Sequence, residues 1–248
     1  MTTMKKIALI LASLLCGFFA SKAAGSGSVV FTDTLPRTDK AANAWEILFN
    51  GSSTDKWTGT NGRPFPSDGW TVKGGRLFLS KQGFGDIITK EKFTDFELVL
   101  DFNLTTGANS GIKYFVNKIK DAGSGKTVIN GPEYQIIDDY NHPAVKNHVH
   151  DVGSTAACYL LYPPENKKLY SAGRWNHVRI IVRGRHVEHW LNGVKVLSYE
   201  RGSQDFREKV AGTKFKDLVG YGEQPEGHIL LTDHGDKVYF RNIKIRRL

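Results

Sequence analysis

Alternation of apolar and polar residues in separate short stretches constrains the fold of this chain more than any other feature. Residues 96–104 carry an apolar side chain at every second position, and residues 112–116, 178–182, 187–191 and 229–231 repeat the pattern. Successive side chains of a strand point to opposite faces of a sheet, so we expect these stretches to be strands with one dry face.

Turn residues stand between these stretches. Asn192-Gly193 predicts a two-residue hairpin turn, because both residues tolerate positive φ angles. The run Asp233-His234-Gly235-Asp236 is predicted to be the turn of a last hairpin, which joins residues 229–231 to residues 238–240.

The end of the chain and its few helical signals complete the prediction of fold. After Phe240 the apolar series resumes at Ile243, a step of three instead of two, which predicts a bulge at Arg241-Asn242. Helical periodicity is weak except over residues 202–210. Many strands with short turns predict an all-β protein, a jelly-roll β-sandwich of two antiparallel sheets.

The N-terminal residues indicate export. Lys5 and Lys6 precede an apolar run over residues 7–20 and then several small residues, which is typical of a cleavable secretory signal over residues 1–24. Residues 25–40 read as a flexible lead-in, and residues 41–248 as a single domain. We therefore expect a secreted or periplasmic protein with no membrane span.

The two cysteines are not expected to form a disulfide. Cys16 lies in the signal, and residues 13–15 before it lack the small residue that lipid attachment needs directly next to the cysteine, so lipidation is not predicted. Cleavage would leave Cys158 as the only thiol, and its apolar neighbours indicate a small core residue rather than a nucleophile.

Charge composition argues against nucleic acid as a partner. The formal net charge is +9, and loss of Lys5, Lys6 and Lys22 with the signal leaves +6. The basic residues are dispersed among acidic ones without a long basic block, which indicates a solvated surface.

Residues 131–143 are the most informative segment for function. Acid, amide and imidazole groups lie on one predicted strand and the turn after it, with Glu133 and Gln135 on one face and Tyr134 and Asp138 on the other. A bulge after Gln135 would change this parity and bring Asp138 beside Glu133. Such groups suit a site that handles sugars, whereas the competing interpretation is a solvated strand end stopped by a proline.

Aromatic side chains offer stacking surfaces for pyranose rings, with polar side chains to bind the hydroxyl groups. For any one of them packing is the competing interpretation, and Trp175 is assigned to the core. The candidates are Trp57, Trp70, Trp175, Trp190, Tyr114 and Tyr134.

Several motifs occur together in a fixed order. They are Leu48-Phe49-Asn50-Gly51, Gly69-Trp70, Phe93-Thr94-Asp95-Phe96, Asn109-Ser110-Gly111-Ile112, Glu133-Tyr134-Gln135, Trp175-Asn176, Leu191-Asn192-Gly193 and Asp233-His234-Gly235. In this order they resemble the 3-keto-disaccharide hydrolase family, secreted bacterial proteins related to the concanavalin A-like lectins and glucanases. The resemblance covers residues 45–248.

The resemblance implies cleavage of glycosides whose C3 hydroxyl a partner oxidoreductase has first oxidised to a ketone. The ketone acidifies the hydrogen on C2, so a base can remove it and the C1 substituent can leave by elimination, followed by addition of water. The candidate acids and bases are Glu133, His142 and His234. The candidates for binding the substrate are Asn109, Gln135 and Arg241, with Tyr134 and Trp70 as stacking partners.

Two other functions remain open on the residues alone. Glu133 and Asp138 have a spacing similar to that of the carboxylate pair of glucanases, which suggests direct glycoside hydrolysis. The same sandwich and side chains would also serve a non-catalytic carbohydrate-binding module.

A divalent metal is a possible cofactor. Glu133 with Asp138, Asp139 or His142 could ligate such an ion, which would polarise the carbonyl of a sugar. His148-x-His150-Asp151 is a second candidate set, although such pairs in loops are more often surface residues.

Overall fold

The alternating stretches pair into two antiparallel sheets in the computed structural model, which describes residues 43–248. The predicted signal over residues 1–24, the lead-in over residues 25–40 and Cys16 lie outside the described residues. The elements are β1 (Glu46–Phe49), β2 (Trp57–Gly59), the 3₁₀ turn η1 (Thr60–Gly62), β3 (Trp70–Lys73), β4 (Arg76–Leu79), β5 (Ile87–Thr89), β6 (Phe96–Leu104), β7 (Asn109–Lys120), β8 (Thr127–Asn130), β9 (Glu133–Ile137), β10 (Trp175–Arg183), β11 (His186–Leu191), β12 (Val194–Glu200), α1 (Gln204–Ala211), β13 (His228–Leu231) and β14 (Val238–Arg247).

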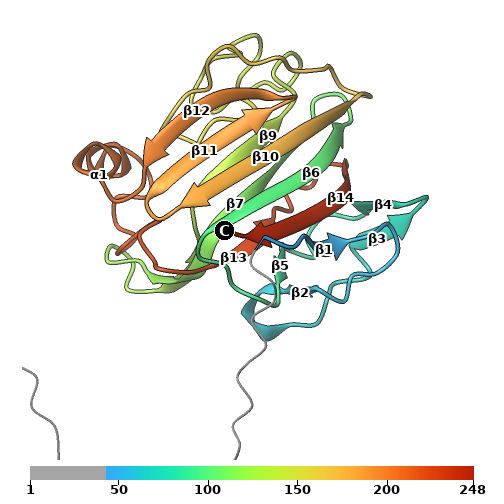
Figure 1. Ribbon diagram of the computed structural model, residues 1–248, viewed down its shortest axis with the longest axis horizontal. Helices are drawn as coiled ribbons and strands as arrows, with labels where there is room; N and C mark the ends of the chain where they lie inside the picture. Colours follow the sequence, from blue (N-terminus) through green and yellow to red (C-terminus); the bar gives the residue numbers. More distant parts are fainter. Residues whose placement is uncertain (1–42) are drawn as a thin grey trace, which may run out of the picture. The chain divides into compact units, whose positions relative to one another are not determined.

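One sheet has eight strands in the order β12-β11-β10-β6-β14-β4-β3, and β1 pairs with the remaining length of β14. Figure 1 shows β12, β11, β10, β6 and β14 side by side, with β7 and β13 behind them. Because β14 is long, β4 and β1 share one of its edges, while β6 occupies the other.

The second sheet has six strands in the order β2-β5-β13-β7-β8, and β9 also pairs with β7. The strand β7 spans 12 residues, so its first half pairs with β9 and its second half with β8. This sharing places the start of β9 after the end of β8 along the same edge of β7.

The hydrophobic core lies between the two sheets. Alternate residues of β6, such as Phe96, Leu98 and Leu100, are fully buried against inward residues of β7 and β9, such as Ile112 and Ile136. Burial of a large apolar side chain contributes about 1.5–3 kcal/mol to stability. The alternation therefore fixes which face of each strand turns outward, and the predicted β-sandwich is confirmed.

A small polar cluster is enclosed in this core. The Tyr114 hydroxyl lies 2.7 Å from both His189 Nε2 and the Tyr199 hydroxyl, so these buried polar atoms satisfy one another. Burial raises the pKa of the neighbouring Cys158 thiol to about 12. Cys158 is thus an inert core residue, as predicted.

Local predictions have mixed outcomes. Asn192 and Gly193 have φ angles of 50° and 83° and join β11 to β12, which confirms the hairpin turn. A register shift after Arg241 confirms the bulge, and α1 confirms the short helix. The predicted last hairpin is wrong, because β13 belongs to the six-stranded sheet and β14 to the eight-stranded sheet.

No helix within residues 43–248 is long and apolar enough to cross a bilayer.

Candidate active site

Glu133 begins β9, whose unbroken pairing with β7 decides where its side chain points. Glu133 lies opposite Lys113 and Gln135 lies opposite Gly111, without a register shift. The intervening Tyr134 packs in the core, so Glu133 and Gln135 point to the outer face of the six-stranded sheet. The bulge considered after Gln135 is absent.

Gly111 makes room for the Glu133 carboxylate. A Cβ atom at this position would lie 1.9 Å from Glu133 Oε1, well inside van der Waals contact. The carboxylate thus lies directly over the backbone of β7, which explains why the Asn109-Ser110-Gly111 motif needs a glycine at its third position.

The carboxylate of Glu133 is buried but incompletely paired. Its Oε2 atom is 4.0 Å from Lys113 Nζ, which itself donates a hydrogen bond of 3.1 Å to Asn130 Oδ1. Glu133 Oε1 and Asn109 Oδ1 are buried without a hydrogen-bond donor among the described residues. An unsatisfied buried polar atom costs about 1–3 kcal/mol, so these two acceptors indicate a place for a ligand that donates hydrogen bonds.

His234 reaches this site from the Asp-His-Gly turn. The Asp233 carboxylate accepts hydrogen bonds from the N–H groups of Gly83 and Gly85, at 3.1 and 2.9 Å, which ties the turn to the loop before β5. The anchored turn places His234 Nε2 3.9 Å from Glu133 Oε1. Half of the His234 side chain remains open to solvent, so the imidazole can exchange protons with it.

Asp86, the residue before β5, supports the same turn. One oxygen of its carboxylate accepts a hydrogen bond of 2.8 Å from the Asp233 N–H. Burial raises the pKa of Asp86, while this hydrogen bond and the charges of Lys113 and His234 oppose the rise. A second acidic group therefore belongs to the electrostatic environment of Glu133.

These side chains line a pocket of about 140 Å³. Tyr159 and Phe215 supply its aromatic wall, with ring centroids 6.4 Å apart, and Lys214 lies over both rings. The lining residues are Asn109, Lys113, Asn130, Glu133, Gln135, Tyr159, Lys214, Phe215 and His234. The pocket combines one carboxylate, one imidazole, two ammonium groups and three amides.

The structure brings together four residues that the sequence singled out, namely Asn109, Glu133, Gln135 and His234. Sequence reasoning missed the others, of which Lys113 could have been found as the cross-strand neighbour of Glu133. Tyr159, Lys214 and Phe215 lie on loops and carried no signal of their own.

Asp138 and His142 are not in the pocket, which corrects their assignment as catalytic residues. Without the bulge Asp138 stays at the turn after β9, where it accepts hydrogen bonds from the Gly107 N–H at 2.8 Å and from Asn141 Nδ2 at 2.8 Å. His142 Nδ1 accepts a hydrogen bond of 3.1 Å from the Ala144 N–H within its own loop. Glu133, Asp138 and His142 therefore form no common metal site within residues 43–248.

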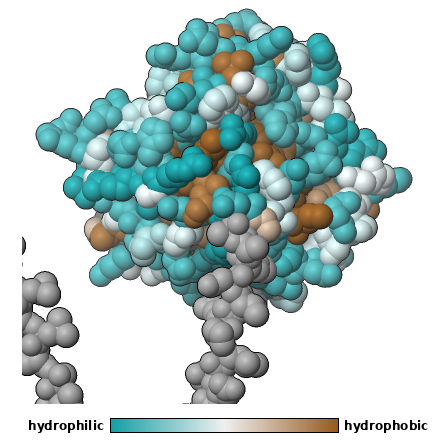
Figure 2. Space-filling view, in the orientation of Figure 1, coloured by the Kyte–Doolittle hydropathy of each residue, from teal (hydrophilic) through white to brown (hydrophobic). Residues whose placement is uncertain are grey.

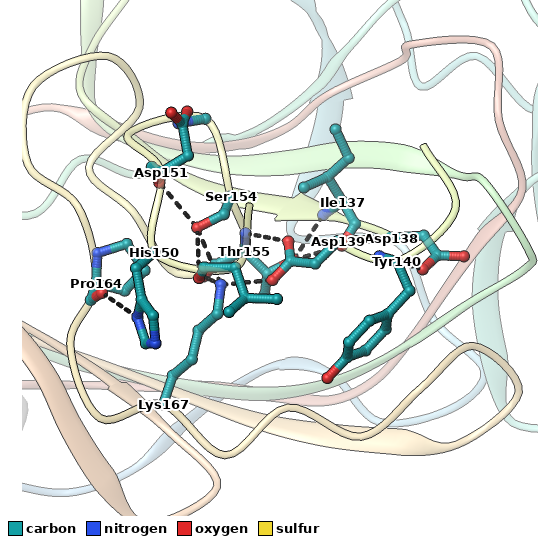
Figure 3. A network of polar contacts seen from close by, with 12 residues as sticks. Ile137, Asp138, Asp139, Tyr140, His150, Asp151, Ser154, Thr155, Pro164 and Lys167 are labelled. Carbon is teal, nitrogen blue, oxygen red and sulfur yellow. Dashed lines mark hydrogen bonds and ion pairs between the residues drawn. The ribbon is translucent and has the colours of Figure 1, made fainter. Parts of the chain in front are cut away.

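Asp139 and Lys167 form a buried ion pair that anchors the long loop after β9 (Figure 3). Lys167 Nζ is 2.5 Å from Asp139 Oδ2 and donates to Ser154 Oγ at 2.9 Å, while the Thr155 N–H donates to Asp139 Oδ1 at 2.8 Å. Burial raises the pKa of Asp139 and lowers that of Lys167, each opposed by the charge of the other. Asp139 is thus a structural residue rather than a metal ligand.

The second candidate metal set is dispersed as well. His150 Nδ1 lies 2.9 Å from the carbonyl oxygen of Pro164, and His148 is exposed on the same loop. No group of three or more potential ligands occurs in the part of the chain that the structure describes.

The proposed stacking partners and Arg241 also need correction. Trp70 and Tyr134 are buried in the core, as are Trp57 and Tyr114, so their faces are not open to a sugar. Arg241 lies on β14 of the other sheet, where its Nε atom donates to Asp101 at 3.0 Å. Its guanidinium covers the ring of Trp175 on the outer face of that sheet, so Trp175 is not a core residue either.

Comparison with known proteins agrees with this architecture. A 3-keto-disaccharide hydrolase of Bacteroides thetaiotaomicron is 31% identical over 233 residues, covering 84% of this chain and 79% of that protein. A solved structure of a candidate glycosyl hydrolase from Parabacteroides distasonis ATCC 8503 is 32% identical, with a TM-score of 0.70 over 82% of this chain and 94% of that chain. A second structure described in the same way, from the same organism, is 30% identical with a TM-score of 0.60, over 83% of this chain and all of that chain.

The family model described as the 3-keto-alpha-glucoside-1,2-lyase-like domain matches residues 44–246, nearly all of the described part of the chain. The match includes every strand from which the pocket is built. The chain therefore belongs to the 3-keto-alpha-glucoside-1,2-lyase-like domain family.

Proposed function

We propose that this protein cleaves the glycosidic bond of 3-keto-glycosides by proton abstraction, elimination and hydration. The observation that carries the proposal is the Glu133 carboxylate, which is buried in a small pocket with one oxygen unpaired and the His234 imidazole 3.9 Å away. The family and the name of its Bacteroides relative support the class of substrate.

Each step of this reaction has a candidate residue in the pocket. Glu133 takes the proton from C2, and the electron pair of the broken C–H bond forms an enolate with the C3 carbonyl. When the ketone re-forms, the C1–O bond breaks, a C1=C2 double bond remains, and His234 donates a proton to the departing oxygen. Water then adds its oxygen to C1 and gives one proton to His234, while Glu133 returns its proton to C2, so both residues are restored and the net reaction is hydrolysis.

The cationic side chains of the pocket suit the negative charge that develops on the substrate during elimination. Enolate formation places negative charge on the C3 oxygen, and a positioned cation stabilises such charge strongly in a site with little water. Lys113 donates a hydrogen bond to Asn130 and lies 4.0 Å from the Glu133 carboxylate, so we assign it to the C3 oxygen. Asn109 and Gln135 would bind the hydroxyl groups of the ring.

Direct hydrolysis fits the pocket less well. A retaining enzyme needs a second carboxylate about 5–5.5 Å from the first, and an inverting one needs it about 6.5–9.5 Å away. Asp138, the expected partner of Glu133, is instead committed to hydrogen bonds in the turn after β9. Elimination requires only one carboxylate, in agreement with the residues present.

A substrate pair tests the proposal. Purified protein is incubated with a 3-keto-disaccharide and with its unoxidised parent, and release of the second sugar is measured. Turnover of the keto-sugar alone is expected, with a primary isotope effect on kcat/KM when C2 carries deuterium. Turnover of the parent would instead support direct hydrolysis, and binding of either sugar without turnover would support a carbohydrate-binding module.

The biological setting is part of the proposal. The substrate requires an oxidoreductase that converts a C3 hydroxyl to a ketone, and the N-terminal pattern suggests that this protein acts outside the cytoplasm. N-terminal sequencing of the mature protein should find a start near residue 24 or 25, whereas an intact Met1 would contradict export by a cleaved signal.

A further inference from the structure

A second and larger depression lies on the same outer face of the six-stranded sheet. Its volume is about 430 Å³, three times that of the pocket at Glu133 and within the range of pockets that bind small molecules. It is lined by Thr58, Gly59, Asn61, Gly62, Ile88, Thr89, Lys90, Lys92, Val116, Asn117, Lys118, Ile129 and His228. We call it the groove.

The groove continues the row of side chains that starts at Glu133. Across the sheet Glu133 pairs with Lys113, Lys113 with Leu230, Leu230 with Ile88, and Ile88 with Thr58. Directly paired residues of neighbouring strands point to the same face. Because strands lie about 4.8 Å apart, roughly 14 Å separates Glu133 from Ile88 along this row.

A second contact links the two cavities along β8. Asn130 lines the pocket and pairs with Asn117, which lines the groove. Ile129, the residue before Asn130, also lines the groove. The pocket and the groove are therefore adjacent parts of one surface, so a molecule with its reacting carbon at Glu133 could extend into the groove.

The floor of the groove is apolar. Ile88, Val116 and Ile129 line it, and below them Leu230 completes a buried cluster that is separate from the core between the sheets. No tryptophan, tyrosine or phenylalanine lines the groove to stack on a sugar. This floor suits an apolar body better than a second hydroxylated ring.

The rim of the groove is cationic. Lys90, Lys92 and Lys118 line it, and no aspartate or glutamate does. Lys92 has a counter-ion in Glu226 at 3.4 Å, whereas Lys90 and Lys118 are exposed and form no ion pair with another described residue. An occupant with a negatively charged substituent would complement this rim.

We infer that the groove is the binding site for the leaving group, and that it favours an apolar aglycone carrying an anionic substituent over a neutral one. The inference rests on the proposed function, because it takes the bond at Glu133 to be the one cleaved. The expected substrates are therefore aryl 3-keto-glucosides whose aryl ring carries an acidic group.

Three 3-keto-glucosides that differ only in the leaving group test the inference. They carry a methyl, a 4-carbamoylphenyl and a 4-carboxyphenyl group, and the last two match in size but differ in charge. We expect kcat/KM for the carboxyphenyl substrate to exceed that for the carbamoylphenyl substrate by about fivefold, since each partly exposed charge pair contributes modestly. In the double variant Lys90→Glu/Lys118→Glu this ratio should fall below one.

Two further variants separate the contributions. Ile129→Asn should lower kcat/KM for both aryl substrates relative to the methyl substrate, because it makes the floor polar. Lys73→Glu, which reverses one charge on the exposed end of β3 in the other sheet, should leave the carboxyphenyl to carbamoylphenyl ratio of the native protein unchanged.

The outcomes distinguish the inference from the proposed function. If the native protein and the Lys90→Glu/Lys118→Glu variant cleave the two aryl substrates in the same ratio, the inference is wrong and the proposed function stands. If none of the three 3-keto-glucosides is cleaved, the proposed function fails and the inference fails with it.

Discussion

Glu97 and Glu133 are two carboxylates at equal depth on opposite sheets, and their surroundings differ. Each is 4% exposed. Glu97 receives hydrogen bonds from Arg179 at 2.5 Å and from Arg246 Nε at 2.7 Å, so both of its oxygens are paired. Glu133 faces Lys113 at 4.0 Å and has one oxygen without a donor.

The pairing of its oxygens separates a structural carboxylate from a functional one. Burial alone would raise the pKa of Glu97, but the guanidinium groups of Arg246 and Arg179 hold it below its usual range. That face of the eight-stranded sheet is largely hydrophilic on the side drawn in Figure 2, and its carboxylates Glu97 and Asp101 are paired with arginines. Glu133 has no comparable partner, so one of its buried oxygens lacks a hydrogen bond. This lowers the stability of the free protein, and a ligand that donates a hydrogen bond to the oxygen would remove the penalty.

The largest expected effect is the loss of activity in Glu133→Gln. General acid–base catalysis contributes about 10²–10⁴-fold, so kcat/KM on a 3-keto-glycoside should fall by that factor. The free energy of unfolding should not decrease, because the amide removes an incompletely paired buried charge. Steady-state kinetics and urea unfolding measure the two quantities.

Glu97→Gln is the matched control for activity, since it makes the same change at the same depth on the other sheet. Its kcat/KM should stay within about twofold of the native value, because no residue of the pocket contacts Glu97. A Glu133→Gln protein with native activity would remove Glu133 from the mechanism.

The next effect concerns a third buried carboxylate, Asp139, whose partner is also buried. Lys167→Met should lower the free energy of unfolding by about 3–5 kcal/mol, because it leaves the Asp139 charge without compensation. Urea unfolding measures the loss, and Lys168→Met, at the exposed neighbouring position, is the control with little expected change. Equal stability of the two variants would contradict the assignment of Asp139 as a structural residue.

A smaller effect is expected for stability in Glu97→Gln, about 1–3 kcal/mol at neutral pH, because hydrogen bonds to a charged group are lost. The pKa of Glu97 is lower in the folded protein than its ordinary value of 4.5. The unfolded chain therefore takes up the proton first as pH falls, and the stabilisation by Glu97 is lost below about pH 4.5. The difference in unfolding free energy between native protein and variant should shrink over the same range, whereas a difference independent of pH would argue against the charge as its cause.

Much of the fold was predictable from sequence, because a sandwich strand must keep one face dry and the resulting alternation is visible. The connection between β13 and β14 was not predictable, because no local signal in residues 229–240 distinguishes a hairpin from a crossing between the two sheets. That crossing explains why His234 reaches the pocket and Arg241, seven residues later, does not.

The site was predictable only in part. Glu133, Gln135 and Asn109 follow from strand parity and from motifs, but Asp138 depended on a bulge that the pairing of β7 with β9 excludes. Lys113 enters the site through cross-strand pairing, and Tyr159 through the packing of a long loop. Contacts of these kinds depend on tertiary structure, which local periodicity does not report.

The smallest expected effect concerns Arg241, which the sequence suggested as a substrate-binding residue and the structure places on the paired face. Arg241→Ala removes a partly exposed ion pair with Asp101 and a cation–π contact in which the guanidinium carbon is 3.9 Å from the centroid of the Trp175 ring. Such contacts are each worth about 1 kcal/mol or less at exposed sites. We expect unfolding free energy to fall by about 1 kcal/mol and KM for a 3-keto-glycoside to stay unchanged. A rise in KM without loss of stability would mean that the substrate contacts the eight-stranded sheet. The incomplete pairing of Glu133 on the six-stranded sheet would then no longer be enough to identify the site.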